Sequence, residues 1–256
     1  MSIFVEERDI RRLRQSGRIL ASVLQEIKQY ILPGMKTKII DEIAEDLIQK
    51  NGAIPAFKGY RGYPASLCIS INEQVVHGIP GDRVIEEGDL VSIDAGVDFE
   101  GFFSDSAYSV VAGDHNVVAE RIVDVAQKSL LEGIKHAIPG NKIGDISFAI
   151  EKEVKNAGYS VVRDFVGHGL GRTLHEEPQI PNYGRKNEGP FIKKGMVLAI
   201  EPMVNEKSFR VSILDDGWTV VTEDGGLSAH YEHTVLITDH GPEILTLWTR
   251  GDDEGE

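Results

Sequence analysis

The chain has 256 residues, of which 41% are hydrophobic, and its 27 basic and 41 acidic residues give a formal net charge of −14 at pH 7. This length suffices for one large α/β domain or two small ones, and no Pro/Gly/Ser-rich linker divides it. The acidic balance argues against a general nucleic-acid binder. Cys68 is the single cysteine, which excludes an intrachain disulfide and is typical of a reducing compartment.

Both ends of the chain are polar. Residues 1–14 carry charges throughout and lack the apolar segment of a signal peptide. No other stretch approaches the roughly 18 apolar residues of a membrane span, so we expect no membrane association and a cytoplasmic protein. Residues 251–256 are only acids and glycine and are expected to form a disordered tail. A single domain is therefore predicted over residues 1–250.

Helical and strand patterns occur in two successive blocks. The first block predicts helices over residues 9–32 and 39–50, ended by Pro33-Gly34 and Asn51-Gly52. Its strand-like runs are 66–72, 75–77, 90–97 and 102–111. The second block predicts helices over 117–138 and 143–157, followed by strands over 159–163, 196–204, 211–222 and 228–238.

Several short residue motifs occur in both blocks, at a nearly constant separation along the sequence. Pro33-Gly34-x-Lys36 recurs as Pro139-Gly140-x-Lys142, 106 residues later. The run ending in Ile93-Asp94 aligns with the run ending in Ile200-Glu201 at offset 107, which places a carboxylate on a carboxylate. This alignment favours an α+β fold of two pseudo-symmetric helix-helix-sheet halves, about 9–113 and 117–240, with an inserted hairpin near 211–222. Chance similarity of helix-stop motifs is the alternative.

Two acids lie on a predicted hairpin. If Asp98-Phe99-Glu100-Gly101 is a four-residue turn, then Asp94 faces Asp105 directly, with Cβ atoms roughly 4.5–5.5 Å apart. Small residues share the face of the acids, whereas the opposite face is apolar. The two like charges would repel each other on this face, and a bound cation would neutralise them. The small residues are Ser92, Gly96 and Ala107, and the apolar ones are Val91, Ile93, Val97, Phe102 and Tyr108. A solvated acid pair on an exposed hairpin is the alternative.

One histidine lies between glycines. In Gly167-His168-Gly169 the small neighbours predict a tight turn with an exposed imidazole. A lone histidine is more often a packed or surface residue than a ligand. Together, carboxylates and one imidazole suit Mn, Fe(II), Co or Zn, and thiolate ligands are absent.

Several motifs, in order and spacing, resemble those of the type I methionine aminopeptidases of the bacterial kind, over residues 3–249. They are Asn72-Glu73-x-Val75-x-His77-Gly78-Ile79-Pro80, Ile93-Asp94 with Asp105, Gly167-His168-Gly169-Leu170-Gly171-Arg172 with His175-Glu176-Glu177-Pro178, Ile200-Glu201-Pro202-Met203, and Tyr231-Glu232-His233-Thr234. The resemblance implies the pita-bread fold, with a central curved antiparallel sheet backed by helices. It also implies removal of the N-terminal methionine ahead of a small second residue.

The resemblance also assigns roles to residues. Two divalent ions (Co, Mn, Fe(II) or Zn) are implied, with Asp94 on one, His168 and Glu201 on the other, and Asp105 and Glu232 bridging both. Glu201 is implied to take a proton from the attacking water, and His77 and His175 to lie beside the substrate amide, although either histidine could be merely structural. The implied methionine pocket and its rim comprise Phe57, Tyr60, Tyr63, Cys68, His77, Leu174, His175 and Trp218. Phe57 and Leu174 differ from some relatives, so pocket width and preference at the second residue stay open.

The expected partners follow from the same resemblance. They are peptides and nascent chains that begin with methionine, with ribosome contact near the exit tunnel, and the protein is expected to be a monomer. Two rivals remain: an aminopeptidase P or prolidase acting on X-Pro peptides, and an inactive pita-bread module that only binds partners. The first usually carries an additional N-terminal domain, and the second should have lost metal ligands.

Overall fold

The fold was examined in a computed structural model that describes residues 3, 4 and 6–247. The helices are α1 (Glu7–Ile27), α2 (Thr37–Lys50), α3 (Val117–Lys135) and α4 (Ile143–Asn156), with short 3-10 helices at Lys28–Tyr30 and Tyr60–Gly62. The strands are β1 (Ile54–Pro55), β2 (Leu67–Ile71), β3 (Gln74–Val76), β4 (Leu90–Phe99), β5 (Phe102–Val111), β6 (Ser160–Val161), β7 (Gly167–Gly169), β8 (Glu176–Ile180), β9 (Val197–Ile200), β10 (Met203–Asn205), β11 (Val211–Ile213), β12 (Val220–Thr222), β13 (Ser228–His230), β14 (Glu232–Thr238) and β15 (Gly241–Ile244). The tail predicted over 251–256 lies outside the described residues.

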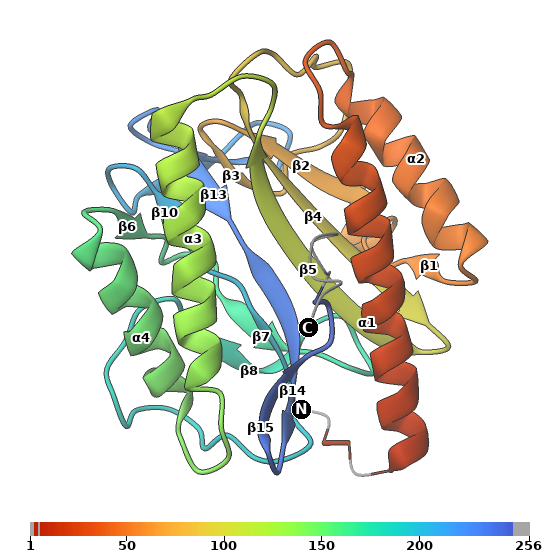
Figure 1. The fold of residues 1–256 in the computed structure, drawn as a ribbon, viewed down its shortest axis with the longest axis vertical. Helices are drawn as coiled ribbons and strands as arrows, with labels where there is room; N and C mark the ends of the chain where they lie inside the picture. The colour runs from red at the N-terminus through yellow and green to blue at the C-terminus, as the bar shows by residue number, and fades with distance from the viewer. Residues whose placement is uncertain (1–2, 5, 248–256) are drawn as a thin grey trace, which may run out of the picture.

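One antiparallel sheet of nine strands runs through the molecule. Its path is β1-β4-β5-β14-β9-β7-β8, with β2 also on β4 and β15 on β14. Figure 1 shows α1 and α2 to one side and α3 and α4 to the other, both pairs in front of the sheet. Two small sheets, β13-β10-β6 and β11-β12-β3, complete the fold. Strands from both blocks of the sequence therefore meet in the central sheet.

Most predicted elements are present, with different limits. The first helix ends at Ile27 and continues as a 3-10 turn, five residues short of the predicted end. The predicted strand 196–204 is interrupted at Glu201 and Pro202, and the strand 228–238 at Tyr231. Strands β1, β7, β8 and β15 were not predicted, because each has two to five residues and none lies in a run of apolar or β-branched residues long enough to stand out.

Helix ends match between the two blocks. The glycines that follow α1, α2, α3 and α4 have positive φ, a conformation that glycine adopts without steric cost. They are Gly34 (90°), Gly52 (73°), Gly140 (94°) and Gly158 (89°). Lys36 pairs with Val84 in an isolated bridge, and Lys142 pairs with Phe191 in the same way. These matches support the proposal that the chain consists of two repeats.

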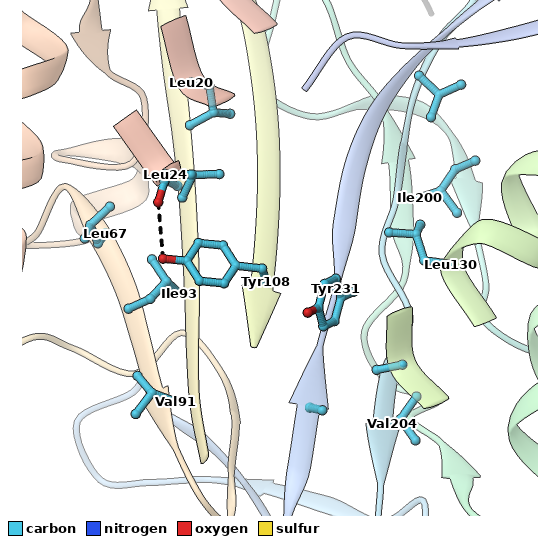
Figure 2. Packing of buried hydrophobic residues seen from close by; sticks show 14 of the residues in the cluster. Leu20, Leu24, Leu67, Val91, Ile93, Tyr108, Leu130, Ile200, Val204 and Tyr231 are labelled. Atoms are coloured by element: carbon cyan, nitrogen blue, oxygen red, sulfur yellow. Dashed lines mark hydrogen bonds between the residues drawn. The ribbon is translucent and has the colours of Figure 1, made fainter. Parts of the chain in front are cut away.

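The helices and the sheet share one apolar core. Figure 2 shows Ile93 and Tyr108 of the sheet beside Leu20 and Leu24 of α1. The Tyr108 hydroxyl donates a hydrogen bond to the Leu24 carbonyl at 3.3 Å, which satisfies a polar group inside the core. Each such buried side chain contributes roughly 1.5–3 kcal/mol. Because side chains alternate along β4, this packing commits Asp94 to the opposite face.

The predicted register of the hairpin is wrong by two residues. Asp94 pairs with Ala107, and Asp105 pairs with Gly96. The loop contains only Glu100 and Gly101, both with positive φ, which suits a two-residue turn rather than the predicted four-residue one. A shift by two keeps both acids on the same face, so they are diagonal neighbours instead of a directly opposed pair.

A close backbone contact fixes α1 against the C-terminal part of the structure. A Cβ added at Gly17 would lie 2.4 Å from the Leu245 carbonyl oxygen. Alanine gains about 1 kcal/mol over glycine in a helix, but the clash with a backbone atom costs about 1–3 kcal/mol. We therefore expect Gly17→Ala to lower the free energy of unfolding, measured by urea denaturation.

The control for this prediction is Gly133→Ala in α3. There the added Cβ meets only the side chains of Ile150 and Ile146, which can move. We expect it to destabilise the protein less than Gly17→Ala does. Equal or greater stability of Gly17→Ala relative to the parent would contradict the assigned contact.

Within the described part of the chain, no helix combines the length and apolar character needed to cross a bilayer.

Candidate active site

The register of the sheet aligns acids and small residues across four strands. One cross-strand row runs from Cys68 on β2 to Asp94 on β4, then to Ala107 on β5 and Glu232 on β14. Ala107 is short, so the side chains of the acids on either side of it have room above the sheet. Asp105 is two residues from Ala107 on the same face. Three carboxylates thus converge over one alanine.

A second row brings in the imidazole. Thr234 on β14 pairs with Ala199 on β9, which pairs with His168 on β7. Thr234 also links the rows, because its hydroxyl donates to the Asp105 carbonyl at 2.7 Å and accepts from the Asp105 N–H at 2.8 Å. Glu201 follows Ala199 by two residues, just beyond the end of β9. The interruption of the predicted strand at this point leaves the Glu201 side chain at the site.

Distances confirm that these side chains cluster. Asp105, His168 and Glu232 each offer a ligand atom within 4.8 Å of the others, and all three are buried. His168 Nε2 lies 4.0 Å from Asp105 Oδ2 and 3.6 Å from Glu201 Oε1. The structure therefore brings together all five predicted metal ligands around one space, with Asp94 beside Asp105.

The predicted turn at His168 is wrong. His168 lies in β7, between β8 and β9, and its side chain is buried rather than exposed. Its glycine neighbours permit close approach of strands, since a Cβ at Gly167 would lie 2.4 Å from the Ala199 carbonyl oxygen and one at Gly169 would lie 2.3 Å from the Glu177 carbonyl oxygen. Alternation of side chains then directs the imidazole toward the acids.

The tautomer of His168 follows from its hydrogen bond. Its Nδ1 lies 3.0 Å from the Gly169 carbonyl oxygen, which can only accept, so Nδ1 carries the proton. Nε2, which faces Asp105 and Glu201, is then the unprotonated nitrogen. This is the arrangement expected of an imidazole that binds a metal ion.

Burial works against negative charge at the site. It is the main cause that raises the pKa of Asp94, Asp105, Glu201 and Glu232 above ordinary values. Neighbouring carboxylates raise the pKa of Asp105 and Glu232 further. Burial also lowers the pKa of His168, which keeps it neutral. Without a cation, four buried acids cannot all be ionised at low cost.

The residues fit a bound divalent cation. Within the described residues, Asp94 Oδ1, Asp105 Oδ1 and Glu232 Oε1 are buried and have no hydrogen-bond partner. Unsatisfied buried oxygens are costly, and three in one cluster call for a positively charged partner. Carboxylate oxygens with one unprotonated imidazole are suitable ligands for Mn, Fe(II), Co or Zn.

A cavity of about 400 Å³ opens over this cluster. Every predicted site residue lines it: Phe57, Tyr60, Tyr63, Cys68, His77, Asp94, Asp105, His168, Leu174, His175, Glu201, Trp218 and Glu232. Phe57, Tyr63, Cys68 and Leu174 are buried in one apolar cluster at its wall. The cavity thus joins an acidic end to an apolar end.

Ring contacts shape the rest of the cavity. His175 stacks on Tyr60, with centroids 5.1 Å apart, and its Nδ1 lies 3.0 Å from the Tyr60 hydroxyl. His77 packs edge-on against Phe165 at 5.5 Å. Burial is the main cause that lowers the pKa of both His77 and His175 to about 4, so both are neutral at pH 7.

Several lining residues were not predicted from the sequence, and one of them, His230, lies beside Glu201. Its Nε2 lies 3.6 Å from Glu201 Oε2. The signal was present, because His230 precedes Glu232 by two residues in a predicted strand and so shares its face. Met203 also lines the cavity and closes the motif Ile200-Glu201-Pro202-Met203, whereas Phe165 and Gln179 line it from segments that carry no quoted motif.

Comparisons with known proteins agree with this geometry. A methionine aminopeptidase of Clostridium perfringens (strain 13 / Type A) is 52% identical over 247 residues, which cover 96% of this chain and 99% of that protein. The crystal structure of a methionine aminopeptidase from Thermotoga maritima matches with a TM-score of 0.93 and 43% identity, over 96% of this chain and 99% of that one. A prolidase from Pyrococcus furiosus matches less well, with a TM-score of 0.79 and 25% identity over 97% of this chain and 66% of its own.

The expected pita-bread fold is confirmed by these structures. The sequence pattern described as metallopeptidase family M24 matches residues 11–239, which is most of the chain. Sequence, fold and the cluster of buried acids around one imidazole therefore agree that this chain belongs to metallopeptidase family M24.

Proposed function

We propose that this chain is a methionine aminopeptidase, which hydrolytically removes the N-terminal methionine from nascent proteins and peptides with a small second residue. The observation that best supports this activity is one cavity that joins the buried acid cluster to a pocket of apolar and aromatic side chains. Relatives that are 43–52% identical over nearly their full length are methionine aminopeptidases, which supports the same activity here.

Two divalent ions are proposed as cofactors. Asp94 would hold one ion, His168 and Glu201 the other, and Asp105 and Glu232 both. Mn, Fe(II), Co and Zn all suit these ligands. When bound, such ions lower the pKa of a water molecule and polarise the scissile carbonyl.

The protein side chains then move protons and hold the substrate. Glu201 is proposed to accept a proton from the attacking water, since its carboxylate is at the cluster and its raised pKa suits a base. His77 and His175 are neutral, and each can donate an N–H to the substrate amide. The Tyr60 hydroxyl lies 3.0 Å from His175 Nδ1, so a donor at Nε2 is available to the cavity when Tyr60 donates to Nδ1.

The apolar end of the cavity is proposed as the methionine pocket. Tyr63 and Trp218 meet edge to face with ring centroids 5.1 Å apart, and the buried Cys68 lies beside them. Aromatic edges and a polarizable thiol are favourable partners for a thioether. A Cβ at Gly96 would lie 2.7 Å from the Phe57 ring, so the ring packs directly on the sheet and limits the width of the pocket.

Activity on X-Pro peptides is the alternative. The prolidase from Pyrococcus furiosus shares the fold, but this chain covers 66% of its length. The alternative that the protein is an inactive module that only binds partners is disfavoured, because all five predicted metal ligands line the cavity. Cytoplasmic location, a monomeric state and action on chains near the ribosomal exit tunnel are proposed with the activity.

A direct assay separates the two peptidase activities. Purified protein loaded with Mn²⁺ is expected to release methionine from Met-Ala-Ser and to leave an X-Pro peptide of equal length intact. Product release is measured by liquid chromatography, with EDTA-treated protein as the control. Faster cleavage of the X-Pro peptide would overturn the proposed substrate, and equal rates after removal of the metal would overturn the proposed cofactor.

A further inference from the structure

His230 is placed beside Glu201 by the small sheet β13-β10-β6. β13 pairs with β10, so that His230 lies opposite Met203, two residues beyond Glu201. The residue is 2% exposed and lines the cavity. Its Nε2 is buried and has no hydrogen-bond partner within the described residues. An unsatisfied buried nitrogen costs roughly 1–3 kcal/mol, which is unusual for a residue that serves only packing.

The backbone of His230 is held on both sides by one hydroxyl. Ser109 Oγ accepts from the His230 N–H at 2.9 Å and donates to the His230 carbonyl at 2.9 Å. Its remaining acceptor site takes the hydroxyl proton of Ser92 at 2.7 Å, so all the bonds are mutually consistent. The strands β4 and β5 that carry Asp94 and Asp105 thus also fix the backbone of His230 relative to the site.

Glu201 lies between two imidazoles. Its Oε1 is 3.6 Å from His168 Nε2, and its Oε2 is 3.6 Å from His230 Nε2. Its backbone is also fixed, because the Asn182 side-chain amide donates to the Glu201 carbonyl at 3.1 Å. The one carboxylate oxygen that faces away from His168 is therefore the one that faces His230.

We propose that His230 is a positioning residue, whose Nε2–H donates to Oε2 of Glu201 and holds that carboxylate in one orientation, with Oε1 toward His168. The separation of 3.6 Å is longer than a hydrogen bond, and hydrogen bonds between catalytic side chains often shorten in the complex with substrate. This role rests on the proposed function, in which Glu201 both binds an ion and accepts a proton. It adds a residue that the five-ligand set does not include.

Three substitutions at His230 test the role. His230→Leu removes the donor, His230→Gln places an amide N–H where Nε2 was, and His230→Asn places it one bond short. We expect His230→Leu to lower kcat on Met-Ala-Ser by about 10–100-fold, with KM within about twofold, and to weaken Mn²⁺ binding by about tenfold. His230→Gln should recover kcat to within about threefold of the parent, while His230→Asn should resemble His230→Leu.

Mn²⁺ binding to the metal-free proteins is measured by isothermal titration calorimetry, and folding by circular dichroism. The matched control is Ser228→Ala in the same strand, which loses a buried hydrogen bond to Asn205 at 2.8 Å. It should lower the melting temperature without changing Mn²⁺ affinity. If His230→Leu does not fold, the comparison of His230→Gln with His230→Asn still decides.

Two results would overturn the proposal. One is parent-like kcat and Mn²⁺ affinity in both His230→Leu and His230→Asn, or in His230→Asn alone if the leucine variant is unfolded. The other is an equal loss in His230→Gln and His230→Asn, which would mean that the ring itself is required. Failure of the proposed function is distinguishable, because a parent that binds Mn²⁺ but releases no methionine still permits the affinity comparison.

Discussion

Replacing Asp105 with asparagine is expected to abolish metal-dependent peptidase activity while making the metal-free protein more stable. Asp105 is buried between Asp94 and Glu232, and the repulsion among these acids destabilises the folded state without a cation. A neutral amide removes one charge and can donate to Asp94. We expect the metal-free variant to gain on the order of 1–3 kcal/mol in free energy of unfolding. Activity should fall at least about 100-fold, because a shared ligand is lost.

Thermal denaturation with and without Mn²⁺ checks this prediction. The parent should gain melting temperature on adding Mn²⁺, and Asp105→Asn should gain little. Asp98→Asn is the control, because Asp98 lies on the same hairpin but outside the cavity, where it accepts a hydrogen bond from the Gly101 N–H at 2.8 Å. An Asp105→Asn protein that is less stable than the parent without metal would show that repulsion does not dominate this cluster.

Substitution of His175 by alanine is expected to lower kcat by about 100-fold or more with a small change in KM. The neutral imidazole lies 4.2 Å from the ring of His168, centroid to centroid, at the point where the substrate amide would meet the acids. Loss of a positioned donor or proton relay typically costs about 10²–10⁴ in rate. Steady-state kinetics on Met-Ala-Ser, with metal content checked by atomic absorption, measures the effect.

Tyr60→Phe is the partner variant for this measurement. It keeps the ring that stacks on His175 but removes the hydroxyl 3.0 Å from Nδ1. We expect Tyr60→Phe to lower kcat about tenfold, because the tautomer and orientation of the His175 imidazole are then less restricted. If His175→Ala raises KM and leaves kcat unchanged, the residue only binds substrate and does not act in the reaction.

The sequence allowed the helices and the central hairpin to be predicted because their signals are local. Proline-glycine and asparagine-glycine stops coincide with the positive-φ glycines, and alternation along 90–99 correctly separated the acid face from the apolar face. The exact register was not predictable from a turn assumed to have four residues. The short strands β7 and β8 were also missed, because their pairing depends on neighbours distant in sequence.

The candidate site was predictable to the extent that strand alternation and motif spacing could reveal it. Asp94 and Asp105 were placed on one face by counting residues, and the resemblance supplied the remaining ligands. A Gly-His-Gly segment is compatible both with an exposed turn and with tight packing between strands. Only the close contacts of Gly167 with Ala199 and of Gly169 with Glu177 show that His168 lies in a buried strand. His230 is the opposite case, because its spacing of two residues from Glu232 in a predicted strand indicates that both side chains lie on the same face.

The predicted metal ligands come from both halves of the chain. Asp94 and Asp105 come from before the connection at 113–116, whereas His168, Glu201 and Glu232 come from after it. Bound ions would therefore connect the two halves, because each half contributes ligands. In a cell that lacks transition metals, the protein would then lose stability as well as activity. The metal-free protein would unfold locally more often, and proteases would degrade it faster.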